Sequence, residues 1–328
     1  MTLPRRIHAI PKWVAGLAIC AMATGVSAAD LGLITAGEHG TYYQFGQDLR
    51  RLLKPHGINV VIHSSNGAAD NVRALLERPS VRLGIVQSDI VAAVTDQPPN
   101  VATAALADGM RLIFPLFDED VHIVARAGVT DIKDLAGQRV AIGREGSGTY
   151  LTAIALFQLA GVAPAAMIAM DGAEAVARLR AGRIDAMVAV AAHPVRLLRD
   201  AVHVRDGLSL VSVTTPAVLN AYAATEIPAR TYPWQPGAVR TVAVKALLLA
   251  YDPDRSHCAI IGQFAQQVLA GLGWLVKNGH PYWRRVDLEK PVRGLDQYDC
   301  VSQRSTQRNP PPRVRQRARP DHTGDRAT

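Results

Sequence analysis

Residues 111–126 read RLIFPLFDEDVHIVAR, and the expected architecture depends on how this stretch is interpreted. Two apolar runs flank the acids Asp118, Glu119 and Asp120, and the apolar residues show no helical spacing. One alternation of strands and helices ends before the stretch, and a second begins after it. We therefore interpret it as an extended segment that crosses between two lobes, with the three acids in a solvated turn in preference to a metal or acid–base cluster.

The chain before this crossing alternates short apolar runs with amphipathic segments. The pattern predicts strands over residues 31–35, 58–63 and 83–87, with helices over 42–54 and 69–77. This βαβαβ order favours a mostly parallel sheet with helices on both faces. We expect residues 30–119 to form the first part of lobe 1.

The chain after the crossing repeats the same alternation. Its pattern predicts strands over 139–142, 167–170 and 186–190, and helices over 147–159 and 174–181. A Pro-rich stretch follows, and residues 239–251 then form an extended run long enough to cross back. We expect an α/β fold of two doubly wound lobes joined by a two-strand hinge. Lobe 2 takes residues 120–243, and residues 244–301 return to lobe 1 with a closing helix over 259–277.

The formal net charge of +8 belongs to the two ends of the chain. Residues 1–29 carry three basic side chains and no acid, and residues 302–328 carry seven arginines against two aspartates. The body between them is therefore formally neutral, which argues against nucleic acid as a partner. Residues 302–328 contain almost no apolar residue, and we expect a disordered basic tail.

The first 29 residues have the layout of a cleavable signal peptide. Arg5, Arg6 and Lys12 precede the apolar run 13–26, and small residues follow, so we expect cleavage near Ala28 or Ala29 and a periplasmic protein. A retained membrane anchor and a lipidated Cys20 remain as alternatives. After cleavage only Cys258 and Cys300 are left, either as a disulfide or as two buried free thiols.

Small polar residues occupy three junctions between a predicted strand and the helix after it, at residues 37–43, 87–89 and 143–149. The first N–H groups of a helix lack intrahelical partners, so such a junction can hold a carboxylate. The alternative is that each hydroxyl is a plain helix N-cap. Asn66 lies in a polar segment that a turn explains equally well, and His193 follows a predicted strand but is as readily structural. The candidate ligand-binding residues are Thr41, Tyr42, Asn66, Gln87, Ser88, Gly146, Ser147, Thr149 and His193.

Motifs typical of enzymes are missing from the sequence. There is no G-x-S-x-G around Ser147, no phosphate loop ending in GK[ST], no H-E-x-x-H and no dinucleotide-binding motif at the first helix. We therefore expect no catalytic residue, no cofactor and no metal site.

Several short segments, in their order and spacing, resemble the TAXI solute receptors of tripartite ATP-independent periplasmic (TRAP) transporters. The similarity runs from about residue 31 to 251. The segments that carry it are GTYY at 40–43, GIVQSD at 84–89, DLAGQRV at 134–140, GSGT at 146–149 and IPARTYP at 227–233. Arg230 and Trp234 depart from the family, which usually has glycine there, and the basic tail is not part of its pattern.

The resemblance implies a type II periplasmic-binding-protein fold. Such a protein would act as a monomer, close over a small carboxylate, glutamate-like in family members, and deliver it to a TRAP-type membrane permease. Two other functions stay open: an enzyme on the same two-lobed fold, and the ligand-sensing partner of a membrane sensor. The sequence also leaves open whether an amine is recognised, with Asp89, Glu145 and Asp171 as possible partners.

Overall fold

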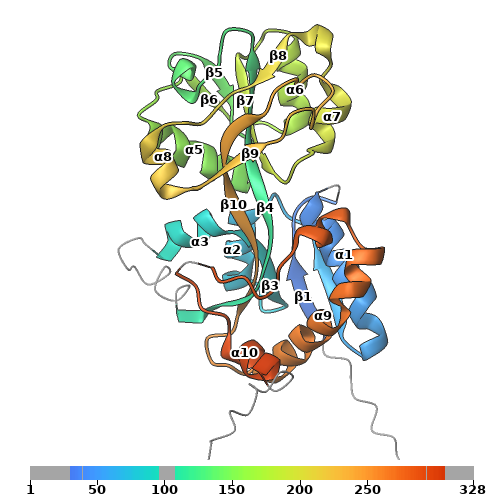
Figure 1. Cartoon of the computed structure of the whole chain (residues 1–328). Helices are drawn as coiled ribbons and strands as arrows, with labels where there is room; N and C mark the ends of the chain where they lie inside the picture. Colours follow the sequence, from blue (N-terminus) through green and yellow to red (C-terminus); the bar gives the residue numbers. More distant parts are fainter. Residues whose placement is uncertain (1–29, 39, 96–107, 293, 307–328) are drawn as a thin grey trace, which may run out of the picture.

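The computed structural model describes residues 30–38, 40–95, 108–292 and 294–306. In this part of the chain two α/β lobes are stacked on each other, and two long strands run through both (Figure 1). The expected signal peptide and residues 307–328 of the expected tail lie outside the described residues.

The first lobe is built on a three-stranded parallel sheet with β1 in the middle, flanked by β2 and β3. Strand and helix alternate as the sequence predicts, and the observed ends differ from the predicted ones by one or two residues. The elements are β1 (Asp30–Ile34), α1 (Thr41–Leu53), η1 (Lys54–His56), β2 (Asn59–His63), α2 (Ala68–Glu77), β3 (Val81–Gln87) and α3 (Ser88–Thr95).

Two antiparallel strands connect the lobes: β4 (Met110–Arg126) and β10 (Val239–Tyr251). Asp118 pairs with Lys245 and Asp120 with Ala243 in their register. The sheet order is β2-β1-β3-β10-β4-β7-β5-β6, with β8 also on β4 and β9 on β10. Both halves of this order place one antiparallel crossing strand beside a parallel α/β unit, and the fold is that of type II periplasmic-binding proteins.

The second lobe lies on the far halves of the crossing strands. Its longer elements agree with the prediction, whereas the short ones after β7 were not anticipated. The elements are η2 (Ile132–Leu135), β5 (Arg139–Ala141), α5 (Gly148–Ala160), β6 (Ala166–Ile168), α6 (Gly172–Arg180), β7 (Ala186–Ala191), α7 (Arg196–Ala201), η3 (Val204–Asp206), β8 (Leu208–Leu210), α8 (Pro216–Ala221) and β9 (Ala223–Ile227).

Each lobe has a hydrophobic cluster on both faces of its sheet. Successive residues of a strand point to opposite faces. In lobe 1, Leu33 and Leu248 accordingly pack with Phe45 and Phe264 on one side, whereas the neighbours of these strand residues join the cluster of α2 on the other. Helices cover both faces for this reason, and the carboxyl ends of the parallel strands are left to face the other lobe.

The C-terminal segment returns to lobe 1 as α9 (Cys258–Asn278), η4 (Pro281–Arg285) and α10 (Asp299–Thr306). By length and composition α9 is apolar enough to cross a membrane. Its residues Ile261, Phe264 and Val268 are nevertheless buried in the core of lobe 1, as in a core helix of a globular domain.

A disulfide joins Cys258 at the start of α9 to Cys300 in α10, with 5.5 Å between the Cα atoms. Closing a loop of this length stabilises a fold by about 4 kcal/mol on the chain-entropy model. The link holds α10 against lobe 1, and the helix continues through Thr306. The expectation that the chain lacks regular structure from residue 302 is therefore wrong for its first five residues.

Candidate functional site

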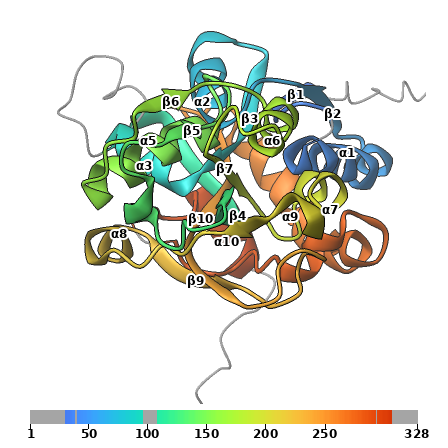
Figure 2. The same cartoon turned by 90° about the horizontal axis from the view of Figure 1, so that it is seen from above.

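The three polar junctions lie at the carboxyl ends of β1, β3 and β5, where the lobes face each other. Thr41 begins α1 after the N-cap Gly40, Ser88 begins α3 directly after β3, and Ser147 is the N-cap of α5. Seen from above, α5 of the second lobe lies over α3 of the first (Figure 2). The helix starts of both lobes thus meet at one interlobe surface.

Direct contacts close this surface on the side of α2, α3 and α5. The hydroxyl of Thr152 in α5 donates to a carboxylate oxygen of Asp89 in α3 at 2.6 Å, and the Tyr222 hydroxyl donates to the same oxygen at 3.4 Å. The backbone N–H of Asp70 donates to the carbonyl of Gly146 at 3.3 Å. Asp89, one of three possible amine partners in the sequence, therefore lies between the lobes.

Three glycines permit this close approach. An ideal Cβ on Gly148 would lie 1.6 Å from Oε1 of Gln87, and one on Gly146 would lie 2.6 Å from Oδ1 of Asp70. A Cβ on Gly67 would meet the Cα of Ser147 at 3.2 Å. A side chain at Gly148 or Gly146 would therefore displace the side chain of Gln87 or Asp70 from this surface, and one at Gly67 would press against the backbone of Ser147. We call Gly67, Gly146 and Gly148 the glycine seam.

The acids of the crossing strand are not in a solvated turn, and that expectation is wrong. They lie in the middle of β4, where Glu119 is 5% and Asp120 3% exposed, and only Asp118 is open to solvent. Asp118 forms an ion pair with Lys245 of β10 at 2.5 Å. Strand pairing across the hinge, rather than a local turn, fixes these side chains, so that two carboxyls are buried at the interlobe surface.

Glu119 receives a hydrogen bond from the Tyr42 hydroxyl at 2.5 Å. Burial raises the pKa of Glu119 to about 8, although hydrogen bonds from Tyr42 and Gln87 lower it and the nearby Asp89 and Asp120 raise it further. Burial likewise raises the pKa of Asp89 above its ordinary value, against the hydrogen bond from Thr152. A carboxyl with a pKa near 8 is mostly protonated at neutral pH.

The candidate hydroxyls have partners inside their own lobes or on the hinge. Ser147 donates to the carbonyl of Arg144 at 2.6 Å and accepts from the N–H of Tyr150. Thr149 accepts from the N–H of Val190, and Ser88 accepts from the N–H of Lys245. Ser147 is therefore an N-cap, and Thr149 and Ser88 keep a hydroxyl proton to donate.

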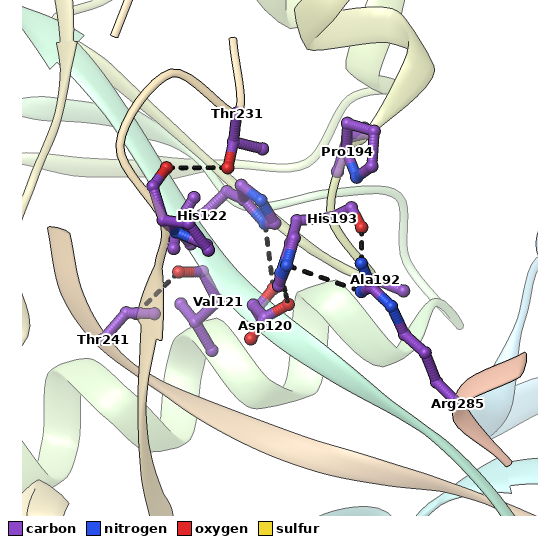
Figure 3. Close-up of polar contacts among 12 residues, drawn as sticks. Asp120, Val121, His122, Ala192, His193, Pro194, Thr231, Thr241 and Arg285 are labelled. Atoms are coloured by element: carbon purple, nitrogen blue, oxygen red, sulfur yellow. Dashed lines mark hydrogen bonds and ion pairs between the residues drawn. The ribbon is translucent and has the colours of Figure 1, made fainter. Parts of the chain in front are cut away.

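His193, after β7, lies against the second buried acid of β4. Its Nδ1 is 2.6 Å from Oδ2 of Asp120, and Nη1 of Arg285 in η4 is 3.4 Å from Nε2 of the same ring (Figure 3). Arg285 also donates to the carbonyl of His193 at 3.1 Å. His193 thus connects lobe 2, the hinge and the C-terminal segment, which is a structural position beside the site.

Sequence reasoning missed the buried residues around this histidine. His122 is fully buried, and burial lowers its pKa to about 4 despite the neighbouring Asp120. Its Nε2 lies 2.8 Å from the Tyr232 hydroxyl. The partners are more than 100 residues apart in the chain, and no local signal in the sequence links them.

Asn66 lies at the edge of the interlobe surface, where its side-chain amide donates to Asp70 at 2.8 Å. Both residues line a cavity of about 480 Å³ beside α2, together with Ser64, Ser65 and Arg73. A second cavity, of about 690 Å³, lies on the loop after β9 and includes Arg230 and Trp234. Arg230 has φ 62°, a region that favours glycine. Thr41, Gln87 and Ser147 line neither of these two cavities.

Residues 33–254, more than half of the chain, match the sequence profile described as the NMT1-like family. The protein belongs to the NMT1-like family. The matched residues include the helix starts, the glycine seam and the whole of both crossing strands. The narrower TAXI assignment stays a proposal.

Solved structures similar to this NMT1-like protein include binding proteins and a regulatory domain. A TctC solute-binding protein from Polaromonas is 15% identical, with 78% of this chain and 86% of that chain covered and a TM-score of 0.44. The periplasmic binding protein BugD is 12% identical, with 78% and 85% covered and a TM-score of 0.48. The CcmR regulatory domain from Synechocystis PCC6803, in complex with 2-PG, is 16% identical, with 74% and 96% covered and a TM-score of 0.45. At these identities the likeness says nothing of this protein's ligand.

Proposed function

We propose that this protein is an exported solute receptor that binds one small molecule between its lobes and performs no chemistry on it. The observation that carries the proposal is the glycine seam. The starts of α3 and α5, from different lobes, come so close that a Cβ on Gly148 would collide with the side chain of Gln87. Two lobes that share only the strands β4 and β10 can rotate about them, and the seam defines where the rotation ends.

A solute that contacts both lobes stabilises the closed state, because only there do both sets of groups reach it. Micromolar affinity requires about 8 kcal/mol net. Several charge-assisted hydrogen bonds of about 1.5–3 kcal/mol each supply that amount. The N–H groups that open α1 and α5 provide such donors for a carboxylate, in keeping with the glutamate-like solute that the TAXI resemblance implies.

Delivery of the solute to a TRAP-type membrane permease, from a periplasmic monomer, completes the proposal. It draws on the TAXI resemblance and on the signal-peptide pattern of residues 1–29. In this role the closed conformation is the signal by which the permease recognises a receptor with bound solute.

The described residues bring a serine, a histidine and an aspartate together at the start of α9, but not in the arrangement of a catalytic triad. Ser256 and Asp252 both contact His257 at the same ring nitrogen, Nδ1, at 2.9 and 3.2 Å. A catalytic triad needs the two partners on opposite ring nitrogens. The group therefore anchors the helix start instead of activating a nucleophile.

Native mass spectrometry of the protein purified from the periplasm without unfolding tests the proposal. We expect a small molecule bound in a one-to-one complex, and a thermal shift when amino acids or dicarboxylates are added to the stripped protein. Turnover of the bound molecule would contradict the receptor role and favour an enzyme. Membrane association that is lost on deletion of residues 302–328, with solute affinity unchanged, would favour a sensor partner.

The helix start of α5 gives a first mutational prediction. Ser147→Ala combined with Thr149→Val should weaken solute binding by about tenfold or more, because it disturbs the N–H groups that face lobe 1. Loss of the N-cap also costs about 1 kcal/mol of stability. Affinity is therefore measured by calorimetry well below the unfolding temperature. The control is Asp131→Ala, which removes the cap of η2 before β5, and affinity equal in both variants would exclude the α5 junction from the site.

A further inference from the structure

We infer that Glu119, Asp89 and Gln87 form a subsite that receives a protonated nitrogen group of the solute. The inference rests on the proposed function, because it places this group between the lobes. In this proposal the helix starts bind the carboxylate of the solute, and these three residues form a second, acidic half of the same site. The three residues come from β4, α3 and β3, at the point where the crossing strand leaves lobe 1.

The first argument is charge. The other buried carboxyls among the described residues have a basic neighbour: Asp48 pairs with Arg51, Asp120 lies 2.6 Å from Nδ1 of His193, and Asp252 lies 3.2 Å from Nδ1 of His257. Glu119 and Asp89 have only neutral partners there, namely hydroxyls, a backbone N–H and the amide of Gln87. Acids taken from water are normally paired with a cation, so these two lack the partner that a cationic solute would supply.

The second argument is an unpartnered acceptor. Gln87 is 3% exposed, its side chain hydrogen-bonds Glu119, and its Oε1 has no hydrogen-bond partner among the described residues. A buried oxygen without a donor costs free energy that a suitable donor recovers. The atom of this cluster that lacks a hydrogen-bond partner is therefore an acceptor. It suits an N–H donor of the solute and does not suit a second carboxylate.

The third argument is position. Oε1 of Gln87 faces Gly148 across the seam, and Asp89 is held by Thr152 and Tyr222 of lobe 2. Opening of the lobes separates Asp89 from Thr152 and Tyr222, and Oε1 of Gln87 from Gly148, so that a solute can reach these two acceptors.

Matched pairs of small molecules test the inference on the full protein after removal of any copurified solute. The pairs are L-glutamate and glutarate, L-aspartate and succinate, and 4-aminobutyrate and butyrate. Titration calorimetry should show binding of at least one amine, with its amine-free partner weaker by about tenfold or more. Equal affinity within that pair would overturn the inference, and so would a failure of all three amines to bind.

Two variants separate recognition from structure. Asp89→Asn and Glu119→Gln should each reduce the preference for the amine over its amine-free partner, whereas a purely structural effect would weaken both members equally and overturn the assignment. Calcium or sodium chloride alone provides a further arm, because saturable binding of a metal ion that displaces the amine would assign the subsite to an inorganic cation.

Proton exchange provides an independent readout. Since Glu119 is mostly protonated at neutral pH, an ammonium group that pairs with it should release a proton. The binding enthalpy in Tris and in phosphate buffer at pH 7 should then differ in the direction of proton release. Proton uptake would contradict the inference. If the inference fails while protein from the periplasm still carries a one-to-one solute, the receptor function stands; if no solute is found either, the function falls too.

Discussion

Gly148→Ala is expected to lower solute affinity by about a hundredfold or more, because the lobes then close only if the Gln87 side chain gives up its buried position beside Glu119. The added Cβ would lie 1.6 Å from Oε1 of the buried Gln87. The helix itself tolerates the change, since alanine is more favourable than glycine in a helix by about 1 kcal/mol. Calorimetric titration gives the affinity, and the radius of gyration from X-ray scattering should stay at the open value when solute is added.

The matched control is Gly273→Ala in α9, another helical glycine, where an added Cβ meets nothing within 4 Å. It should bind solute like the unchanged protein and be as stable or slightly more stable. If Gly148→Ala binds as tightly as this control and still compacts on addition of solute, the seam is not the closing surface.

Glu119→Gln is expected to change how stability depends on pH. Glu119 has its pKa raised from 4.5 to about 8, so between these values the unfolded chain has lost its proton while the folded protein keeps it. The free energy of unfolding therefore falls as pH rises through this window, by up to about 1.4 kcal/mol per pH unit. The variant has no carboxyl at this position and does not show this decrease. Its free energy of unfolding, relative to that of the unchanged protein, should therefore rise from pH 5 to pH 8.

His122 acts in the opposite direction over part of the range. Its pKa is lowered from 6.5 to about 4, so its contribution to stability rises with pH between those values in both proteins. Urea unfolding of both proteins at several pH values isolates Glu119 in the difference, most clearly between pH 6.5 and 8. Glu77→Gln, the same change on an exposed part of α2, is the control. Parallel pH profiles for Glu119→Gln and the unchanged protein would show that Glu119 is not protonated in the folded state.

Most of the architecture could be predicted because the local spacing of apolar residues indicates each longer strand and helix. The βαβαβ order of residues 31–87 appears as alternating apolar runs and amphipathic segments, and β10 coincides with the predicted run 239–251. The short elements α7, α8 and β9 were missed, since segments of five or six residues have too few positions to display a period.

The acidic part of the site was misjudged for a physical reason. Asp118, Glu119 and Asp120 are charged residues in a row, and such residues are usually exposed. Residues 118–120 themselves contain no glycine, proline or asparagine, although aspartate is also common in turns. Their absence from Asp118–Asp120 was the signal that β4 continues without interruption, with alternate side chains directed to its two faces.

The polar junctions were found from sequence because a helix start follows directly from its strand. The pairing of those junctions was not, because Asp89 and Thr152 are 63 residues apart, and Tyr42 and Glu119 are 77 apart. Contacts of this kind depend on how the two lobes meet. Local patterns contain no information about that.

Hydrogen–deuterium exchange with and without the copurified solute tests most directly whether one molecule is held by both lobes. We predict slower exchange in two regions together, residues 87–90 at the start of α3 and residues 146–150 at the start of α5, with exchange in α9 unchanged. Protection confined to one lobe, or to the loop after β9, would contradict binding between the lobes.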